Sequence, residues 1–457
     1  MAHEKALDLL SEIFGNRLSL SSSDLELHGT SEAHFPVTAP DAVVYVNSIE
    51  DVKKLIGVCY EQECPVIAWG TGTSLEGHTL APRGGISVDF SQMNRVLKIN
   101  ADDMTVIVEP GVTREALNEE LRATGLFFPV DPGANASLGG MAATRASGTT
   151  TVRYGTMHDN VLSLSVVLSD GRYIETGNQA PKSSAGYDLT SLFVGSEGTL
   201  GLITQLTLRL HPQPEAISAG IVAFDDMDSA VSAVIQTIQL GLPMARIEFV
   251  DAATAAAFNA YAKADMAEVP HLLFELHGSE SNVADSAEMF NDICTDHGGL
   301  GFQWSSKTEE RTSLWAMRHK AYYAVLASRP GSTAVITDIC VPISKLGQAV
   351  AETRDDISQS SIQGPIFGHV GDGNFHAILL IDPDNEKEKA EAMRIGDKMA
   401  TRALSFGGTC SGEHGVGMGK LKFMEAQHGA GWDVMGQIKR QLDPLNILNP
   451  GKLVRQN

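Results

Sequence analysis

The sequence has few cysteines, few aromatic residues and fewer basic than acidic residues. Five cysteines without a C-x-x-C pair predict reduced, mostly buried thiols and no disulfide framework. The 34 lysines and arginines stand against 56 aspartates and glutamates, and a net charge of −22 argues against nucleic-acid partners. An anionic substrate would therefore need a local cationic pocket.

Long apolar runs are also missing. No run approaches the roughly 20 residues that span a bilayer, so no transmembrane segment is expected. The N-terminal region carries the acids Glu4, Asp8 and Glu12 where a targeting peptide would be basic, which predicts a cytoplasmic location. A length of 457 residues predicts two or three domains.

Two common nucleotide fingerprints are absent. With Gly70 and Gly72 as the first glycines of a dinucleotide motif, the third would be residue 75, which is Leu75. The segment 415–420 fails as a P-loop, because His414 stands where its first glycine should be. Nicotinamide and ATP thus lose their main sequence support as cofactors.

Hydrophobic periodicity divides the chain into segments. Two closely spaced prolines in 211–215 predict the main domain boundary, after which strands alternate with alanine-rich helices as in an α+β domain on an antiparallel sheet. The predicted segments are a helical segment 1–35, a first domain 36–213, a second domain 214–420 and a C-terminal segment 421–457 that returns to the first domain. Strands are predicted at 42–46, 65–69, 105–111, 162–168, 201–210 and 272–276, with helices at 49–62, opened by Ser48, and from Thr113.

Three glycine-rich blocks lie within about 135 residues, at 70–74, 131–140 (continuing to 155) and 195–201. Any one of them could be an ordinary turn. Glycines let a backbone approach a ligand closely, and free N–H groups suit a pyrophosphate. Together the blocks indicate a large ligand that lies against the backbone at several places.

The glycine-rich blocks resemble the FAD-binding domain of the vanillyl-alcohol oxidase (p-cresol methylhydroxylase) superfamily. This resemblance covers nearly the whole chain and implies an α+β fold, with a two-subdomain FAD-binding domain and an α+β cap domain on an antiparallel sheet. Thr73 stands where members with covalent flavin carry histidine, so noncovalent FAD is implied. Arg145 and Ser147 depart from the common residues at their positions. The implied FAD-binding residues are Gly70, Thr71, Gly72, Thr73, Ser74, Pro132, Gly133, Ser137, Gly140, Thr144, Gly148, Glu197, Gly198 and Ile203.

Two histidines flank a turn in 367–376. A four-residue turn over 371–374 would pair His369 with His376 across a hairpin, with Cβ atoms roughly 4.5–5.5 Å apart, close enough to share a metal ion. Downstream, Glu413 and His414 lie in a glycine-flanked loop. Glu413 could complete a catalytic metal site with open positions, while His414 faces a substrate. The alternative is that both histidines are satisfied structurally beside a hairpin.

Arg318 lies among Trp315, Met317 and the tyrosines 322 and 323, an unusual setting for a merely solvated charge. An arginine fork can bind a carboxylate through two parallel hydrogen bonds. A solvated helix face remains the alternative for this cluster.

These motifs narrow the resemblance to FAD-linked D-lactate dehydrogenases, with related D-2-hydroxyglutarate and glycolate dehydrogenases. It implies that His369, His376 and Glu413 hold a divalent metal ion (Zn, Mn or Fe), and that His414 is the base. Arg318 and Tyr322 would bind the substrate carboxylate, with Asn374 near the flavin. The implied reaction is oxidation of a D-2-hydroxy acid to a 2-oxo acid by hydride transfer to flavin N5.

The substrate and acceptor are less constrained. Ile336 stands where the hydroxyglutarate enzymes carry lysine, which favours a short or apolar substrate side chain such as that of D-lactate. A cytochrome, a quinone, an electron-transfer flavoprotein or oxygen could accept the electrons. A flavin-free metallohydrolase and a non-catalytic flavoprotein are the rival functions. The oligomeric state stays open, with a homodimer among the options.

Overall fold

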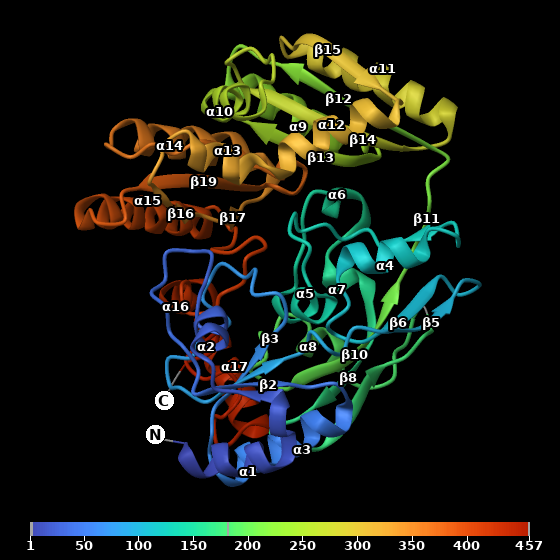
Figure 1. Cartoon of the computed structure of the whole chain (residues 1–457). Coiled ribbons are helices and arrows are strands. Elements are labelled where there is room, and N and C mark those ends of the chain that lie inside the picture. Colours follow the sequence, from blue (N-terminus) through green and yellow to red (C-terminus); the bar gives the residue numbers. More distant parts are fainter. Residues whose placement is uncertain (1–2, 181, 456–457) are drawn as a thin grey trace. The chain divides into compact units, whose positions relative to one another are not determined.

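The computed structural model describes residues 3–180 and 182–455, and its elements are labelled in Figure 1. The ends of the predicted segments 1–35 and 421–457 thus lie partly outside the described residues. The chain forms two compact units. The first comprises Met1–Ser147, Gly155–Gln213 and Glu413–Asn457, and the second comprises Gly148–Tyr154 and Pro214–Gly412.

The first unit contains a four-stranded sheet with a parallel core. Its valine-rich strands are buried, and the helices α1 (Glu4–Phe14) and α3 (Ile49–Glu61) bury their apolar sides in the same hydrophobic cluster. The strand order is β1 (Leu18–Ser19), β2 (Ala42–Tyr45), β4 (Ile86–Asp89) and β3 (Val66–Trp69), with β2 and β3 both parallel to β4.

A second, antiparallel sheet completes the first unit. Its order is β5 (Val96–Asn100), β6 (Thr105–Val108), β10 (Leu202–Arg209), β8 (Val161–Val167) and β9 (Tyr173–Gly177), and β7 (Leu126–Phe127) pairs with β11 (His211–Pro212). Its other helices are α2 (Ser22–His28), α4 (Arg114–Leu121), α5 (Leu138–Thr144), α7 (Met157–Asn160), α8 (Leu189–Phe193), α16 (Leu421–His428) and α17 (Ala430–Leu442).

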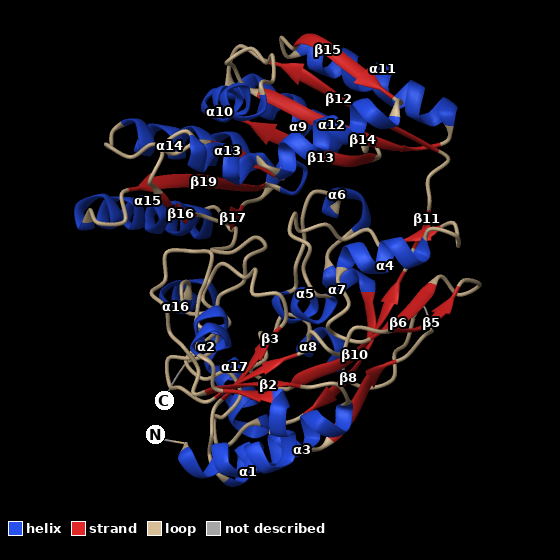
Figure 2. Cartoon of the chain, in the orientation of Figure 1, coloured by secondary structure: helices blue, strands red, loops and turns tan. Residues whose placement is uncertain are grey.

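The second unit is built on one large antiparallel sheet. The order is β15 (Leu300–Ser305), β12 (Ala216–Ala223), β14 (His271–Gly278), β13 (Met244–Val250), β18 (Ile366–Gly368), β19 (Asn374–Ile381) and β16 (Thr333–Ile336), while β17 (Ile339–Cys340) pairs with β19. Its helices, blue in Figure 2, are α6 (Thr151–Tyr154), α9 (Met227–Gln239), α10 (Ala252–Ala262), α11 (Glu280–Asp296), α12 (Thr308–His319), α13 (Ala321–Ala327), α14 (Leu346–Ser358) and α15 (Glu386–Ser405).

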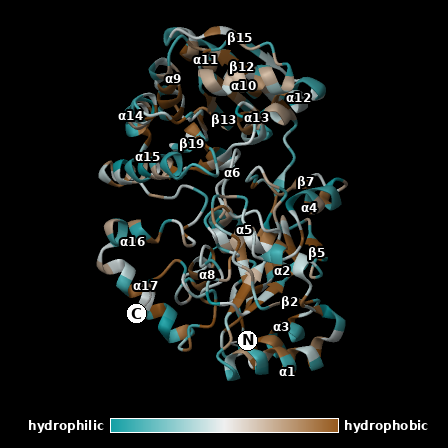
Figure 3. Cartoon of the chain, turned by 60° about the vertical axis from the view of Figure 1, so that its left-hand side comes forward, coloured by the Kyte–Doolittle hydropathy of each residue, from teal (hydrophilic) through white to brown (hydrophobic). Residues whose placement is uncertain are grey.

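The two faces of this large sheet carry different helices. Val250, Leu273 and Phe367 pack with α10, α12 and α13 in one hydrophobic cluster. On the opposite face Phe274 contacts Phe290 of α11, with ring centroids 4.8 Å apart. Figure 3 shows the same pattern of burial: hydrophobic residues gather on the strands, and hydrophilic residues lie on the outer faces of the helices.

The predicted α+β class with an antiparallel sheet in the C-terminal half is confirmed. Each strand predicted above is present with ends shifted by a few residues at most. Ser48 caps α3 and Thr113 caps α4, each accepting a hydrogen bond from a backbone N–H in the first turn. The cysteines are reduced and four of the five are buried, as predicted. Among the described residues, no helix has the length and hydropathy needed to cross a membrane.

Candidate active site

The first glycine-rich loop follows β3 and leaves little space for added side chains. A Cβ at Gly70 would lie 2.1 Å from Oγ of Ser137, so that side chain would have to move, and Gly72 has a φ of +73°, which favours glycine. Ser74 Oγ, Trp69 Nε1 and Thr79 Oγ1 are buried and have no hydrogen-bond partner among the described residues. Such a loop, with polar groups left to satisfy, fits a bound pyrophosphate.

The other predicted cofactor residues lie in loops, in helix α5 and in strand β10. In the first unit, Thr71 and Thr73 lie in the first loop, with their hydroxyls 3.3 Å apart. Pro132 and Gly133 precede α5, which contains Gly140 and Thr144. Glu197 and Gly198 precede β10, which contains Ile203. Gly148 belongs to the second unit.

Glu197 has a contact role that its motif did not reveal. Its buried carboxylate accepts hydrogen bonds from the N–H groups of Val416 (2.7 Å) and Gly417 (2.9 Å) and lies 3.2 Å from Nε2 of His78. Burial acts to raise the pKa of Glu197, but the charge of His78 and these donors outweigh it, and the pKa lies below its usual value. The Glu197 side chain therefore anchors the loop that follows His414.

His414 lies beside a second buried carboxylate that the sequence did not single out. Its Nδ1 is 3.9 Å from Oε1 of Glu76, and the same oxygen is 3.3 Å from Nζ of Lys420. The carbonyl oxygen of Glu76 accepts a hydrogen bond from the N–H of Met418 at 2.8 Å. Glu413 accepts a hydrogen bond from Ser147 at 3.3 Å. The loop 413–420 is thus held from several sides within the first unit.

In the second unit, the predicted pairing of His369 with His376 is wrong by two residues. His376 pairs with Phe367, and His369 precedes a 3₁₀ turn at Val370–Asp372 that closes the connection. A shift of two residues keeps side chains on the same face of a sheet. The two imidazole rings therefore still meet, with centroids 5.6 Å apart.

Hydrogen bonds define the protonation of both rings. Nδ1 of His376 lies 3.0 Å from the carbonyl oxygen of Thr337, and a carbonyl only accepts, so Nδ1 carries the proton. Nδ1 of His369 donates to the carboxylate of Glu248, at 2.8 and 3.0 Å. Metal-binding histidines are commonly held in this way, with the lone pair at Nε2. The pair therefore fits a divalent metal ion.

Arg318 is buried and is hydrogen-bonded to Glu248, the carboxylate that also binds His369. Its Nη2 donates to Glu248 at 2.6 Å, and its guanidinium lies 4.8 Å from the ring centroid of Phe367. Its Nε is buried and has no partner among the described residues. Tyr322 is half-buried against the hydrophobic cluster that contains Phe367, and its ring contacts that of Tyr323.

Asn374 is hydrogen-bonded to a further buried acid, Asp338. Asn374 Nδ2 donates to Asp338 at 2.8 Å and to the carbonyl of Ile339 at 2.7 Å, while its Oδ1 is buried without a partner among the described residues. Ser411 also donates to Asp338, at 2.9 Å. Asp338 thus ties the segment that leads to Glu413 to the sheet strand that carries His376.

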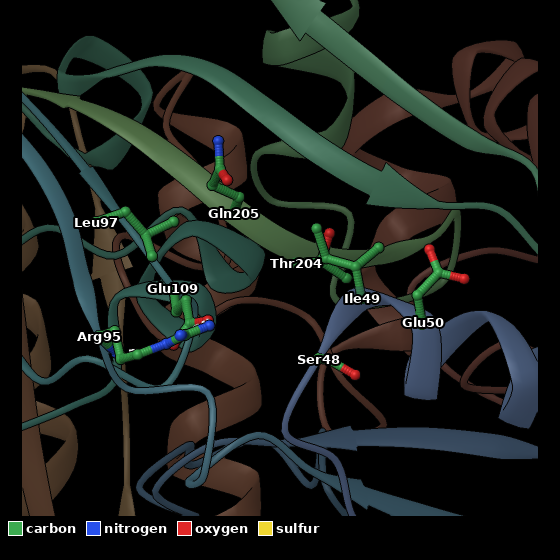
Figure 4. Close-up of a pocket in the computed structure, with 8 residues that line it drawn as sticks. All are labelled: Ser48, Ile49, Glu50, Arg95, Leu97, Glu109, Thr204 and Gln205. Atoms are coloured by element: carbon green, nitrogen blue, oxygen red, sulfur yellow. Dashed lines mark hydrogen bonds and ion pairs between the residues drawn. The ribbon is translucent and has the colours of Figure 1, made fainter.

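A cavity of about 360 Å³ lies elsewhere, in the first unit (Figure 4). Its one arginine, Arg95, is already paired with Glu109 at 2.7 Å. None of the predicted site residues lines this cavity, so it is not the candidate site. Its lining residues are Ser48, Ile49, Glu50, Arg95, Leu97, Glu109, Thr204 and Gln205.

Two known protein families match the chain. Residues 40–177 match the FAD binding domain family, and residues 213–453 match the family described as FAD linked oxidases, C-terminal domain. The chain belongs to the FAD-linked oxidases. The predicted class of FAD-binding oxidoreductase is thereby confirmed.

Two relatives and one solved structure cover nearly the whole chain. The probable mitochondrial D-lactate dehydrogenase of Danio rerio is 45% identical, covering 99% of this chain and 92% of the relative. The mitochondrial D-lactate dehydrogenase (cytochrome) of Arabidopsis thaliana is 42% identical, with 99% and 80% covered. The structure of p-cresol methylhydroxylase with substrate bound superposes with a TM-score of 0.81 at 19% identity, over 99% and 96% of the two chains, which shows a shared fold.

One prediction is overturned by these relatives. Both are named as mitochondrial proteins, so the prediction of a cytoplasmic location is wrong.

Proposed function

We propose that this FAD-linked oxidase is a dehydrogenase that oxidises D-2-hydroxy acids, above all D-lactate, to 2-oxo acids. The names of the Danio rerio and Arabidopsis thaliana relatives support this substrate. The observation that carries the proposal is the pair of imidazoles, His369 and His376, each with its proton on Nδ1. The Glu248 carboxylate also joins His369 to the buried Arg318.

The cofactors divide the chemistry between them. When bound, FAD supplies a hydride acceptor at its N5, and a divalent metal ion supplies Lewis-acid polarisation of the substrate hydroxyl. The backbone of Gly70 to Ser74 would hold the FAD pyrophosphate noncovalently. The remaining predicted FAD residues would contact the rest of that cofactor.

His369 and His376 would bind the metal ion through Nε2, and Glu413 would be the third ligand. Glu413 is the residue after Gly412, where an added Cβ would lie 2.1 Å from Nδ2 of Asn374. Consecutive Cα atoms are about 3.8 Å apart, so chain continuity keeps Glu413 close to the strand that carries His376. Imidazole and carboxylate ligands accept Zn, Mn or Fe.

Arg318 would bind the substrate carboxylate. Its Nε remains as a buried donor, and a carboxylate there would satisfy it. Tyr322 would add a hydroxyl to this carboxylate site, and Asn374 would present its buried Oδ1 toward the flavin side of the substrate. These contacts orient the C2 hydrogen for transfer.

His414 would remove the proton of the C2 hydroxyl at Nε2. The proximity of Glu76 to Nδ1 supports this assignment, since a carboxylate there favours a proton on Nδ1 and leaves the lone pair on Nε2. The proton then rests on an imidazolium next to a carboxylate.

Ile336 supports a small substrate side chain. It lies in β16, pairs with Ile378 and packs against an apolar cluster, which offers no charge to a second carboxylate. Glycolate and D-2-hydroxyglutarate are the alternative substrates. A cytochrome is the favoured electron acceptor on the name of the Arabidopsis thaliana relative, with a quinone or an electron-transfer flavoprotein as the alternatives.

Anaerobic mixing of the purified flavoprotein with D-lactate, L-lactate, glycolate and D-2-hydroxyglutarate tests the proposal. D-Lactate should bleach the flavin absorbance faster than the others, and removal of metal by a chelator should stop bleaching until metal is restored. Flavin that none of these acids bleaches would support a non-catalytic flavoprotein. A colourless protein with hydrolytic activity would support a metallohydrolase, and full bleaching after verified metal removal would refute the metal site.

A further inference from the structure

Glu248 is a buried acid that joins two parts of the proposed site. It lies in β13, a central strand of the large sheet, with 0% of its surface exposed. One carboxylate accepts hydrogen bonds from Nδ1 of His369 and from Nη2 of Arg318, which are 121 and 70 residues away in the chain. All three residues belong to the second unit.

A fully buried carboxylate is costly unless its charge is paired and its oxygens are hydrogen-bonded. Arg318 supplies the opposite charge. An ionised carboxylate can only accept, so His369 must donate from Nδ1 and keep its lone pair at Nε2. The same group therefore sets the tautomer of His369 and the direction of the Arg318 guanidinium.

We propose that Glu248 is a positioning residue that couples metal binding to recognition of the substrate carboxylate. This inference rests on the proposed function, in which His369 binds the metal ion and Arg318 the substrate. Loss of the Glu248 charge frees the His369 ring to rotate or change tautomer, and it leaves Arg318 without its anchor. Both affinities should then fall together.

The molecule offers a matched comparison in Glu275. This acid lies on the neighbouring strand β14, 6% exposed, and its cross-strand partner Arg246 is two residues from Glu248, so both acids lie on one sheet face. Glu275 also has a histidine and an arginine as neighbours: His277 Nε2 at 2.8 Å and Arg246 Nε at 3.5 Å. However, Nδ1 of His277 is hydrogen-bonded to the hydroxyl of Tyr154 at 2.6 Å. Both ring nitrogens of His277 are therefore hydrogen-bonded to protein side chains.

The experiment compares wild type, Glu248→Gln and Glu275→Gln as FAD-loaded full-length proteins. After chelation, Mn²⁺ affinity is measured by competition with a coloured chelator, and KM and kcat for D-lactate are measured at saturating Mn²⁺. Loss of an outer-shell partner typically weakens metal binding about 10–100-fold. Glu248→Gln should show this loss together with a KM raised roughly tenfold or more, as expected when one hydrogen-bonded charge is lost. Glu275→Gln should change neither value more than about twofold, which is within ordinary variation for sites that share no partner.

A further variant, Glu248→Asp, keeps the charge and covers the case in which Glu248→Gln does not fold. Its metal affinity should lie below that of wild type, because the shorter side chain reaches His369 poorly. Wild-type affinity in every Glu248 variant that retains FAD would overturn the inference while leaving the proposed function intact. Equal losses in Glu275→Gln would also overturn it, since the effect would then be general to buried acids. A wild-type protein that binds no Mn²⁺ would refute the proposed metal site itself, and this inference with it.

Discussion

The two units hold their predicted functional residues by different physical means. The first unit relies mainly on the backbone: Gly70 leaves no space for a Cβ beside Ser137, and Gly72 adopts a left-handed conformation. The second unit relies on side chains, since Glu248, Arg318 and His369 come from separate elements and meet on one face of a sheet. The difference predicts that changes in the first unit mainly affect cofactor retention, while changes in the second affect the chemistry. Glu413 and His414, two side chains on a loop of the first unit, are the proposed exceptions.

The largest effect is expected from His376→Ala. Lewis-acid polarisation contributes several kcal/mol, so turnover should fall by roughly 10³-fold or more. FAD content should stay unchanged, because His376 lies in the second unit. Steady-state turnover and flavin absorbance of the purified variant measure the two effects. Loss of FAD together with activity would contradict the separation of roles.

His414→Ala tests one of these exceptions. A general base typically contributes about 10²–10⁴-fold, so flavin reduction by D-lactate should slow by that range in stopped-flow experiments. FAD should remain bound. Glu76→Gln, which alters the neighbour of His414 without removing the ring, should give a smaller loss of about 10-fold. Near-normal reduction in His414→Ala would remove this residue from the mechanism.

Gly70→Ala tests the backbone role of the first unit. The added methyl group conflicts with Ser137 Oγ at 2.1 Å, so either the loop or the Ser137 side chain, itself a proposed FAD contact, must move, and FAD affinity should fall about tenfold or more. Fluorescence of free flavin during dialysis measures this loss. The control is Gly57→Ala in α3, where an added Cβ meets nothing within 4 Å. Equal FAD loss in the control would indicate general destabilisation.

Lys452 tests how the C-terminal segment supports the first unit. Its ammonium is buried and donates to the carbonyl of Leu80 and to Asn449, both at 2.5 Å, and burial lowers its pKa from 10.5 to about 7. Between these values the unfolded chain binds a proton that the folded chain does not, so stability rises with pH by up to about 1.4 kcal/mol per unit. The free energy of unfolding of wild type minus that of Lys452→Met should therefore increase by about 2–3 kcal/mol from pH 7 to pH 9. A flat difference in urea titrations would refute the shifted pKa.

Ser48→Ala should have the smallest effect. Ser48 Oγ accepts a hydrogen bond from the N–H of Asp51 at 3.3 Å at the start of α3, and such a cap contributes about 1 kcal/mol. Ser48→Asp should retain the cap and the stability in the same denaturation experiment. FAD content and turnover should not change in either variant. A change in turnover in Ser48→Ala would show that losing this cap in the first unit also affects the chemistry, which would contradict the separation of roles.

Local features of the sequence determined much of this structure. Caps such as Ser48 and Thr113, the buried valine-rich strands and the glycine-rich loops depend on neighbours within a few residues, so they can be predicted from sequence. The two histidines were also predictable as a pair, because an error of two residues in register leaves the sheet face unchanged.

Only the tertiary structure decided which buried acids serve the site. Glu248, Asp338 and Glu76 carry no local signal, and the groups that they hold lie 36 to more than 300 residues away in the chain. A carboxylate in an alternating strand looks the same whether it is solvated or paired with a distant arginine. Burial and the position of that partner make the difference, and both arise only when the sheet and its covering helices assemble.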